Sequence, residues 1–185
     1  MITWIVIGVI VLLLVYAVSI YNGLVRLRQL VREGFSGITV QLRRRADLIP
    51  NLVETVKGYA SHERGTLEAV IAARNAAASA QTVPDKVAAE NVLTGALGKL
   101  FALSEAYPDL KANQNFLSLQ GEISDIENKL AAARRFFNSA VSEFNAAIQQ
   151  FPAVLMAGAM GFKERSFFDV GEDRAAVSAA PQVKF

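Results

Sequence analysis

The hydrophobic positions of this chain begin as a uniform stretch and become periodic only afterwards. No charged side chain occurs from Met1 through Val25, and residues 2–20 are almost wholly isoleucine, valine, leucine and small residues. A helix of that length crosses the ~30 Å hydrocarbon core of a bilayer. The pattern predicts a transmembrane anchor over residues 1–25.

A cleaved signal peptide is the alternative for this stretch, with Ala17, Val18 and Ser19 as its candidate cleavage site. Signal peptides have a basic N-terminal region and a shorter apolar core, but no Lys or Arg precedes Ile2 here. An uncleaved anchor is therefore the favoured prediction. Trp4 lies near one end of the anchor and Tyr21 near the other, where aromatic rings prefer the membrane interface.

Beyond the anchor, apolar residues recur every three or four positions, which is the spacing of one helix face. They are Leu24, Leu27, Val31, Phe35, Ile38 and Leu42. The anchor should therefore continue as helix. The triplet Arg43, Arg44 and Arg45 is predicted to end it, Asp47 to cap the next helix and Pro50 to occupy that helix's first turn. We predict a helix corner at residues 43–50.

Further helices are predicted after this corner. The first runs from about Leu48 to Ala80, and Thr82 and Pro84 start the second. Pro108 disfavours helical geometry at the residue before it and so marks another corner. The last helix has a coiled-coil-like apolar seam. Its residues are Phe116, Leu119, Ile123, Ile126, Leu130, Ala133, Phe137, Val141, Phe144, Ile148 and Phe151.

These elements predict an all-α protein, because no segment shows the sustained period of two that indicates strands. Helices joined by short corners pack antiparallel. Residues 26–152 are expected to form an elongated antiparallel bundle of about four long helices, and residues 153–185 an irregular tail that is disordered over Ala175–Phe185. The tail's apolar residues are expected to dock on the bundle, a neighbouring subunit or the membrane face. They are Met156, Phe162, Phe167 and Phe168.

The basic residues predict the orientation of the anchor in the membrane. Arg26, Arg28 and Arg32 follow the apolar stretch closely, and Lys- and Arg-rich segments stay in the cytoplasm. We expect an inner-membrane protein with its N-terminus outside and its helical domain cytoplasmic. The net charge is +2 and the pI near 9.0. Because the excess of basic residues lies beside the anchor, anionic lipid is an expected partner and nucleic acid is not.

Catalytic and metal-binding chemistry has few candidate residues. His62 is the only histidine and there is no cysteine, whereas zinc sites and di-metal bundle centres need several such ligands. Ser36 lacks the G-x-S-x-G spacing of a hydrolase nucleophile. The sequence predicts no enzyme, no metal and no cofactor. An acid–base site at Asp47, Glu54 and His62 is kept as a minor alternative.

Two groups of residues are candidate interaction sites instead. The first is a polar corner, in which the turns near Pro50 and Pro108 are expected to form one end of the bundle. Its residues are Arg43, Arg44, Arg45, Asp47, Pro50, Asn51, Glu54, His62, Tyr107, Pro108 and Asp109. The second is a packing or oligomer seam, in which Asn fixes register or binds a partner's backbone. Its residues are Phe137, Asn138, Phe144, Asn145, Phe162, Phe167 and Phe168.

Three long motifs resemble the LemA family. They read RRRADLIPNLVETVKGYASHE over residues 43–63, YPDLKANQNF over residues 107–116 and LQGEISDIENKL over residues 119–130. They stand in the family's order after a hydrophobic segment that ends in Tyr21-Asn22, and the similarity spans nearly the whole chain. The resemblance implies a membrane anchor with a helical cytoplasmic domain, and association with envelope-stress and membrane-proteolysis factors. It implies no defined biochemical activity.

Two functions are therefore hypotheses at this point. The first is a non-enzymatic, self-associating scaffold or adaptor beneath the membrane, with other membrane proteins as partners. The second is a lipid-binding or membrane-remodelling element, in which the basic helix from Arg26 to Arg45 and the apolar segment 153–168 engage lipid. Oligomer formation supports the first, and salt-sensitive binding to anionic vesicles supports the second.

Overall fold

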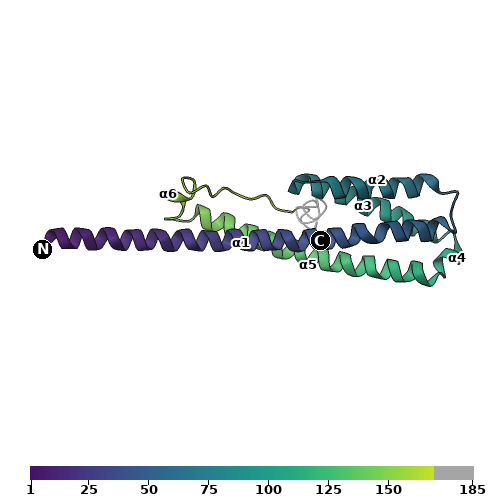
Figure 1. Cartoon of the computed structure of the whole chain (residues 1–185), viewed down its shortest axis with the longest axis horizontal. Coiled ribbons are helices and arrows are strands. Elements are labelled where there is room, and N and C mark those ends of the chain that lie inside the picture. The colour runs from purple at the N-terminus through teal and green to yellow at the C-terminus, as the bar shows by residue number, and fades with distance from the viewer. Residues whose placement is uncertain (169–185) are drawn as a thin grey trace, which may run out of the picture. The chain divides into compact units, whose positions relative to one another are not determined.

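The computed structural model describes residues 1–168, and most of this range is helical (Figure 1). The long helices are α1 (Ile2–Lys57), α2 (Arg64–Ser79), α3 (Val83–Ser104) and α5 (Gln114–Gln149). Two short helices, α4 (Pro108–Lys111) and α6 (Val154–Ala157), lie in the connections. No strand occurs among residues 1–168, so the predicted all-α class is confirmed.

The first helix contradicts the predicted corner at residues 43–50, because α1 continues without a break to Lys57 with Pro50 inside it. Proline removes the N–H that normally bonds the carbonyl four residues earlier, here that of Ala46. The Arg74 side chain of α2 replaces this donor, with its Nε 3.2 Å from the Ala46 oxygen. The proline is therefore tolerated in the helix interior, and the chain reverses at residues 58–63 instead.

Two other predicted boundaries are confirmed, at Thr82 and at Pro108. Thr82 is the N-cap of α3, its hydroxyl oxygen accepts a hydrogen bond from the Asp85 backbone N–H at 3.2 Å, and Pro84 lies in the first turn. Pro108 begins the one-turn helix α4. Each of these signals is local, because a cap needs only a hydroxyl three residues before an N–H and a proline acts on its own backbone.

The described chain packs as two compact units. The first unit contains residues 1–38 and 133–167, and the second contains residues 39–132 with Phe168. Helices α1 and α5 therefore contribute to both units. Each unit has buried side chains of its own.

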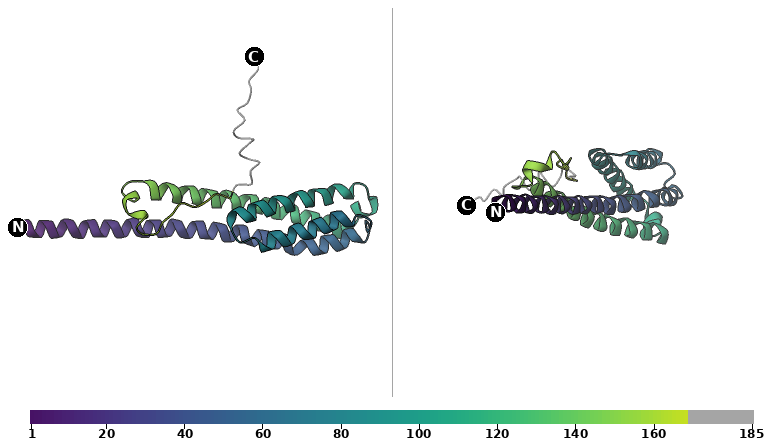
Figure 2. Two further views of the ribbon diagram at one scale, coloured as in Figure 1. Left: turned by 90° about the horizontal axis from the view of Figure 1, so that it is seen from above. Right: turned by 60° about the vertical axis from the view of Figure 1, so that its left-hand side comes forward.

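The second unit is a helical bundle in which α2 and α3 lie side by side (Figure 2). Its core consists of aliphatic side chains from helices α1 to α5 and one aromatic ring from α5. Its fully buried members include Leu52 of α1, Val70 of α2, Leu93 and Leu100 of α3 and Leu110 of α4. The core is thus formed by apolar faces of several helices.

In the first unit, α1 approaches α5 closely at Gly34. A Cβ at Gly34 would lie 2.9 Å from the Cα of Phe137, and the rings of Phe35 and Phe137 are 5.9 Å apart. Glycine is therefore required there to let the two backbones approach. The predicted seam of α5 is buried at Val141 and Phe144, but its last member, Phe151, is 80% exposed.

After α5 the chain turns back and runs alongside α1 (Figure 2, left). Phe162 is buried and lies 5.7 Å from the ring of Tyr21 and 6.3 Å from that of Phe144. Phe168 is also buried, whereas Phe167 is 46% exposed. The predicted disorder of residues 175–185 falls outside the described residues.

Candidate functional site

The predicted polar corner does not form as one site, because its residues separate into three places in the second unit. Arg45 lies in the core, Tyr107 and His62 lie near one end of the bundle, and Arg43, Arg44 and Asp47 line its sides. The separation follows from Pro50, which lies inside α1 and about 10 Å before the helix ends.

Arg45 is the most deeply buried charged side chain among the described residues, and only 1% of it is exposed. Its guanidinium lies 3.3 Å from a carboxylate oxygen of Glu90 and 3.1 Å from one of Glu127, and it donates to the Thr94 hydroxyl at 2.9 Å. The side chain of Glu90 is 3% exposed, whereas that of Glu127 is 46% exposed. The buried pair therefore joins α1 to α3.

Sequence reasoning placed Arg45 at an exposed corner and missed Glu90 altogether. A usable signal existed, because Arg45 interrupts the apolar stripe of α1 between Leu42 and Ile49, and Glu90 precedes the buried Leu93 of α3 by one turn. Opposite charges within the apolar faces of two helices indicate a buried ion pair. Replacing both partners of such a pair by apolar residues is often neutral, whereas removing one partner is costly.

The polar end of the bundle is built by two turns. The Tyr107 hydroxyl donates to the Glu63 carboxylate at 3.2 Å, and the Asn113 side-chain amide donates to the Tyr59 hydroxyl at 2.9 Å. The predicted meeting of two corners therefore occurs, but between residues 59–63 and 107–113. His62 is exposed in the first turn, and Pro108 and Asp109 are exposed in the second.

Tyr107 has an altered acidity at this end. Partial burial of the ring, the hydrogen bond to Glu63 and the negative charge of that carboxylate together raise the pKa of Tyr107 above its ordinary value of 10.0. The hydroxyl is thus held in its neutral, donating form. Its hydrogen bond links the two turns, and the hydroxyl does not serve as a proton-transfer group near neutral pH.

The sides of the bundle carry mixed charge. Arg43 and Asp47 line a hollow of about 360 Å³ together with Arg74, Lys86 and Glu90. Arg44 lines a second hollow with acidic and basic side chains of α5. Because each hollow combines cations with carboxylates, neither has the uniform sign that collects a strongly charged ligand.

The remaining predicted corner residues are ordinary surface positions. Asn51 is exposed and its carbonyl accepts the Thr55 hydroxyl at 2.8 Å. Glu54 is 3.3 Å from Lys57 in an exposed ion pair. Among residues 1–168, no group of three or more His, Asp or Glu side chains is placed to hold a metal ion.

The first unit holds the residues predicted at the membrane interface. Trp4, Arg26 and Arg32 are exposed, as is Tyr21 at 41%. The Arg28 guanidinium lies 5.2 Å from the centre of the Phe162 ring, a cation–π distance. Helix α1 is long and apolar enough to cross a membrane, and its most apolar window has no buried residue.

The seam asparagines have different surroundings. The Asn145 side chain binds the backbone of Arg165 twice, since its oxygen accepts the Arg165 N–H at 2.9 Å and its amide donates to the Arg165 carbonyl at 2.9 Å. Asn145 thus fastens the returning segment onto α5. Asn138 is half-buried one heptad earlier, next to the buried Phe137.

Comparison with known proteins places the chain in a family. Residues 34–185 match the LemA family. The Protein LemA of Metamycoplasma hominis is 26% identical over 155 residues, which are 82% of this chain and 69% of that protein. The magnetosome protein MamQ of Magnetospirillum gryphiswaldense is 32% identical over 73 residues, which are 40% of this chain. MamQ 1 of Paramagnetospirillum magneticum is 30% identical over 73 residues.

The magnetosome proteins are similar to this chain over only part of their length, since the matched region covers 27% of each. The family match is broader, runs from residue 34 to residue 185 and includes the second unit and the part of the first unit after residue 33. It also includes Arg45, Tyr107 and Asn145, whose contacts join the elements described above. By this match the chain belongs to the LemA family.

Proposed function

We propose that this protein is a non-enzymatic, single-pass inner-membrane protein whose helical domain acts as a self-associating scaffold or adaptor on the cytoplasmic face, with other membrane proteins as partners. The anchor is the apolar part of α1, which is long enough to span a bilayer and has no buried residue. The basic residues that follow it support the cytoplasmic orientation. Membership of the LemA family supports the general type.

The observation that carries self-association is the outward face of α3. Between Ala88 and Gly98 the only charged residue is Glu90, which is buried, while Val92 is 62% exposed. Gly95 is exposed and a Cβ there would meet no atom within 4 Å. Exposed glycine costs a helix about 1 kcal/mol relative to alanine. A small, uncharged face suits close contact with another helix, and a second copy of α3 offers the same surface.

A non-enzymatic role is supported by how the buried polar groups are used. Arg45 is paired with Glu90, and the third buried polar residue, Ser104, donates its hydroxyl to the Phe101 carbonyl at 2.6 Å. These side chains bind one another or the backbone of their own helix. His62 is exposed at a turn, where it is not held against a base or a nucleophile.

Cross-linking in native membranes tests self-association directly, because the chain contains no cysteine. We expect Val92→Cys to form a covalent dimer with a short bis-maleimide. Glu68→Cys, on an exposed position of α2, serves as the matched control and should stay monomeric. Equal cross-linking of both variants, or of neither, would overturn the proposed face, and a monomeric mass in lipid nanodiscs would overturn self-association.

Orientation is tested by labelling whole cells with a membrane-impermeant maleimide. Ser61→Cys lies in the exposed turn after α1 and should react only after the inner membrane is permeabilised. Reaction in intact, outer-permeabilised cells would reverse the proposed topology.

A further inference from the structure

The connection from Phe151 to Gly161 is uncharged and unusually exposed for an apolar segment. Phe151 is 80% exposed, Leu155 is 73% exposed and Val154 is 50% exposed. Charge returns only at Lys163. A continuous exposed surface of this kind marks a contact with protein or membrane.

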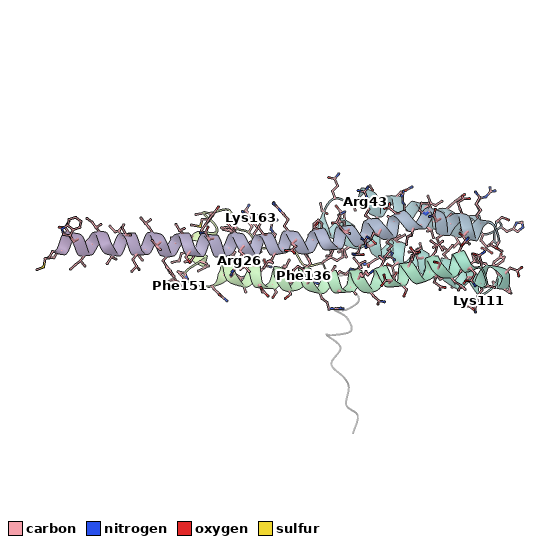
Figure 3. All side chains as sticks on the ribbon, turned by 60° about the horizontal axis from the view of Figure 1, so that its bottom comes forward. Arg26, Arg43, Lys111, Phe136, Phe151 and Lys163 are labelled. Atoms are coloured by element: carbon pink, nitrogen blue, oxygen red, sulfur yellow. The ribbon has the colours of Figure 1, made fainter. Side chains whose placement is uncertain are left out.

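The connection lies against the apolar part of α1. Ile10, Leu13, Leu14 and Ala17 share one helix face, and with Phe151, Pro152 and Met156 they line an almost wholly apolar hollow of about 670 Å³. Figure 3 shows Phe151 nearer the N-terminal end of α1 than Arg26 and Lys163, which lie at a similar level along the helix. The connection is thus placed beside residues 10–17 and not beside the basic ones.

This placement sets how deep the connection lies in the bilayer. At 1.5 Å per residue, Ala17 lies about 14 Å and Ile10 about 24 Å beyond Arg26 along α1. One leaflet accounts for about 15 Å of the hydrocarbon core. With the basic residues at the headgroups, the connection reaches through the leaflet on the side of the helical domain to about the bilayer midplane.

Several backbone polar groups of the connection bond to one another, which suits that depth. The N–H groups of Val154, Met156 and Ala157 reach carbonyls of residues 150–153 at 2.8–3.0 Å. Those of Met160 and Phe162 reach the carbonyls of Met156 and Ala157 at 3.0 Å. A backbone in hydrocarbon must satisfy its hydrogen bonds internally, since no water is there to do so. An exposed loop in water has no such requirement.

We propose that residues 151–161 form a second membrane element, a wedge that inserts into one leaflet beside the anchor and takes lipid acyl chains in the apolar hollow. The inference rests on the anchor in the proposed function. Lys163 and Arg26 mark the level of the lipid phosphates, where long basic side chains reach the interface. Phe162 directly follows the wedge and is buried against Tyr21 and Phe144, which fastens this end of the connection to α1 and α5.

The full chain tests this proposal through single cysteines that carry an environment-sensitive NBD fluorophore. The protein is placed in phosphatidylcholine nanodiscs with or without lipids that carry a nitroxide on the acyl chain. Leu155→Cys probes the wedge, Leu13→Cys the anchor, and Ser139→Cys an exposed position of α5 in the same unit. We expect the nitroxide to quench L155C about as strongly as L13C and to leave S139C bright.

The outcomes separate the wedge from the anchor. Quenching of L13C without quenching of L155C overturns the wedge and leaves the anchor in place. If the emission of L155C is blue-shifted but not quenched, a second copy of the protein covers residues 151–161 instead of lipid. Absence of quenching at L13C overturns the anchor and the wedge together.

A charge substitution gives an independent check. In a chain labelled at Met160→Cys, Leu155→Asp should abolish the quenching, because a carboxylate is costly to place in hydrocarbon. Leu117→Asp, at a 44% exposed site of the second unit, is the matched control and should leave quenching unchanged. Undiminished quenching in L155D would overturn insertion of the wedge.

Discussion

Removal of the Arg45 guanidinium should destabilise the bundle far more than removal of any exposed cation. The Arg45→Met substitution keeps most of the side chain's apolar stem but takes the positive charge away from Glu90, whose side chain is 3% exposed. Breaking a buried ion pair by deleting one partner costs about 3–5 kcal/mol. The exposed pair Lys129–Asp125, at 2.6 Å with side chains 52% and 60% exposed, provides the contrast. Exposed pairs contribute about 0–1 kcal/mol.

The assay is thermal unfolding of the full chain in detergent, followed by circular dichroism at 222 nm. A loss of about 3 kcal/mol corresponds to a midpoint about 10 °C lower for a domain of this size. Lys129→Met should shift the midpoint by no more than about 3 °C. If R45M and K129M shift the midpoint equally, the burial of the Arg45–Glu90 pair does not govern its energy and the reasoning fails.

A second substitution tests the cause. Replacing both partners of a buried pair by apolar residues of similar volume is often neutral or stabilising. The double variant Arg45→Met with Glu90→Met should therefore be more stable than R45M alone. A double variant that is less stable than R45M would show that Glu90 stabilises the bundle by another route than its pairing with Arg45.

Three further predictions follow from particular contacts. Gly34→Ala should destabilise the first unit by about 1–3 kcal/mol, measured by thermal unfolding, because its Cβ would lie 2.9 Å from the Cα of Phe137. Arg74→Ala should cost about 1 kcal/mol in the natural protein but less in a Pro50→Ala background, where a backbone N–H again serves the Ala46 carbonyl. Stability should fall above pH 10 as Tyr107 ionises, and Tyr107→Phe should lack that part of the pH profile.

Each of these predictions has its own control. Gly121 is an exposed helical glycine where an added Cβ would meet no atom within 4 Å, so Gly121→Ala should stabilise by up to about 1 kcal/mol. Equal losses for Arg74→Ala in both backgrounds would show that its bond to Ala46 does not compensate for the proline. The direction of the pH dependence follows from the raised pKa of Tyr107, because folding favours the neutral hydroxyl. The contribution of Tyr107 to the free energy of unfolding is therefore complete below pH 10. It declines as the pH rises through the pKa of the folded state. An unchanged alkaline profile in Y107F would contradict this.

Much of the fold could be predicted from local sequence. The uncharged stretch before Arg26 has the length of a membrane helix because hydrocarbon excludes charge, and the apolar spacing of α5 reflects 3.6 residues per turn. The boundaries at Thr82 and Pro108 were predicted because capping and proline chemistry act within a few residues. Such signals act between residues close in the sequence, so the structures that they predict do not depend on tertiary contacts.

The rest depended on contacts between segments distant in the sequence. Pro50 reads as a helix start, and only the Arg74 side chain of another helix makes it acceptable in the interior of α1. Arg45 was predicted at a helix corner, and only its pairing with Glu90, Glu127 and Thr94, all distant in the sequence, makes its burial tolerable. The sequence alone determined that the chain is helical, where α3 and α4 begin, and that the first helix is apolar and long enough to cross a membrane. The tertiary structure decided which charges are buried, which turns meet and which apolar segment lies beside the anchor, because the free energy of a buried group is set by the partner that packing brings to it.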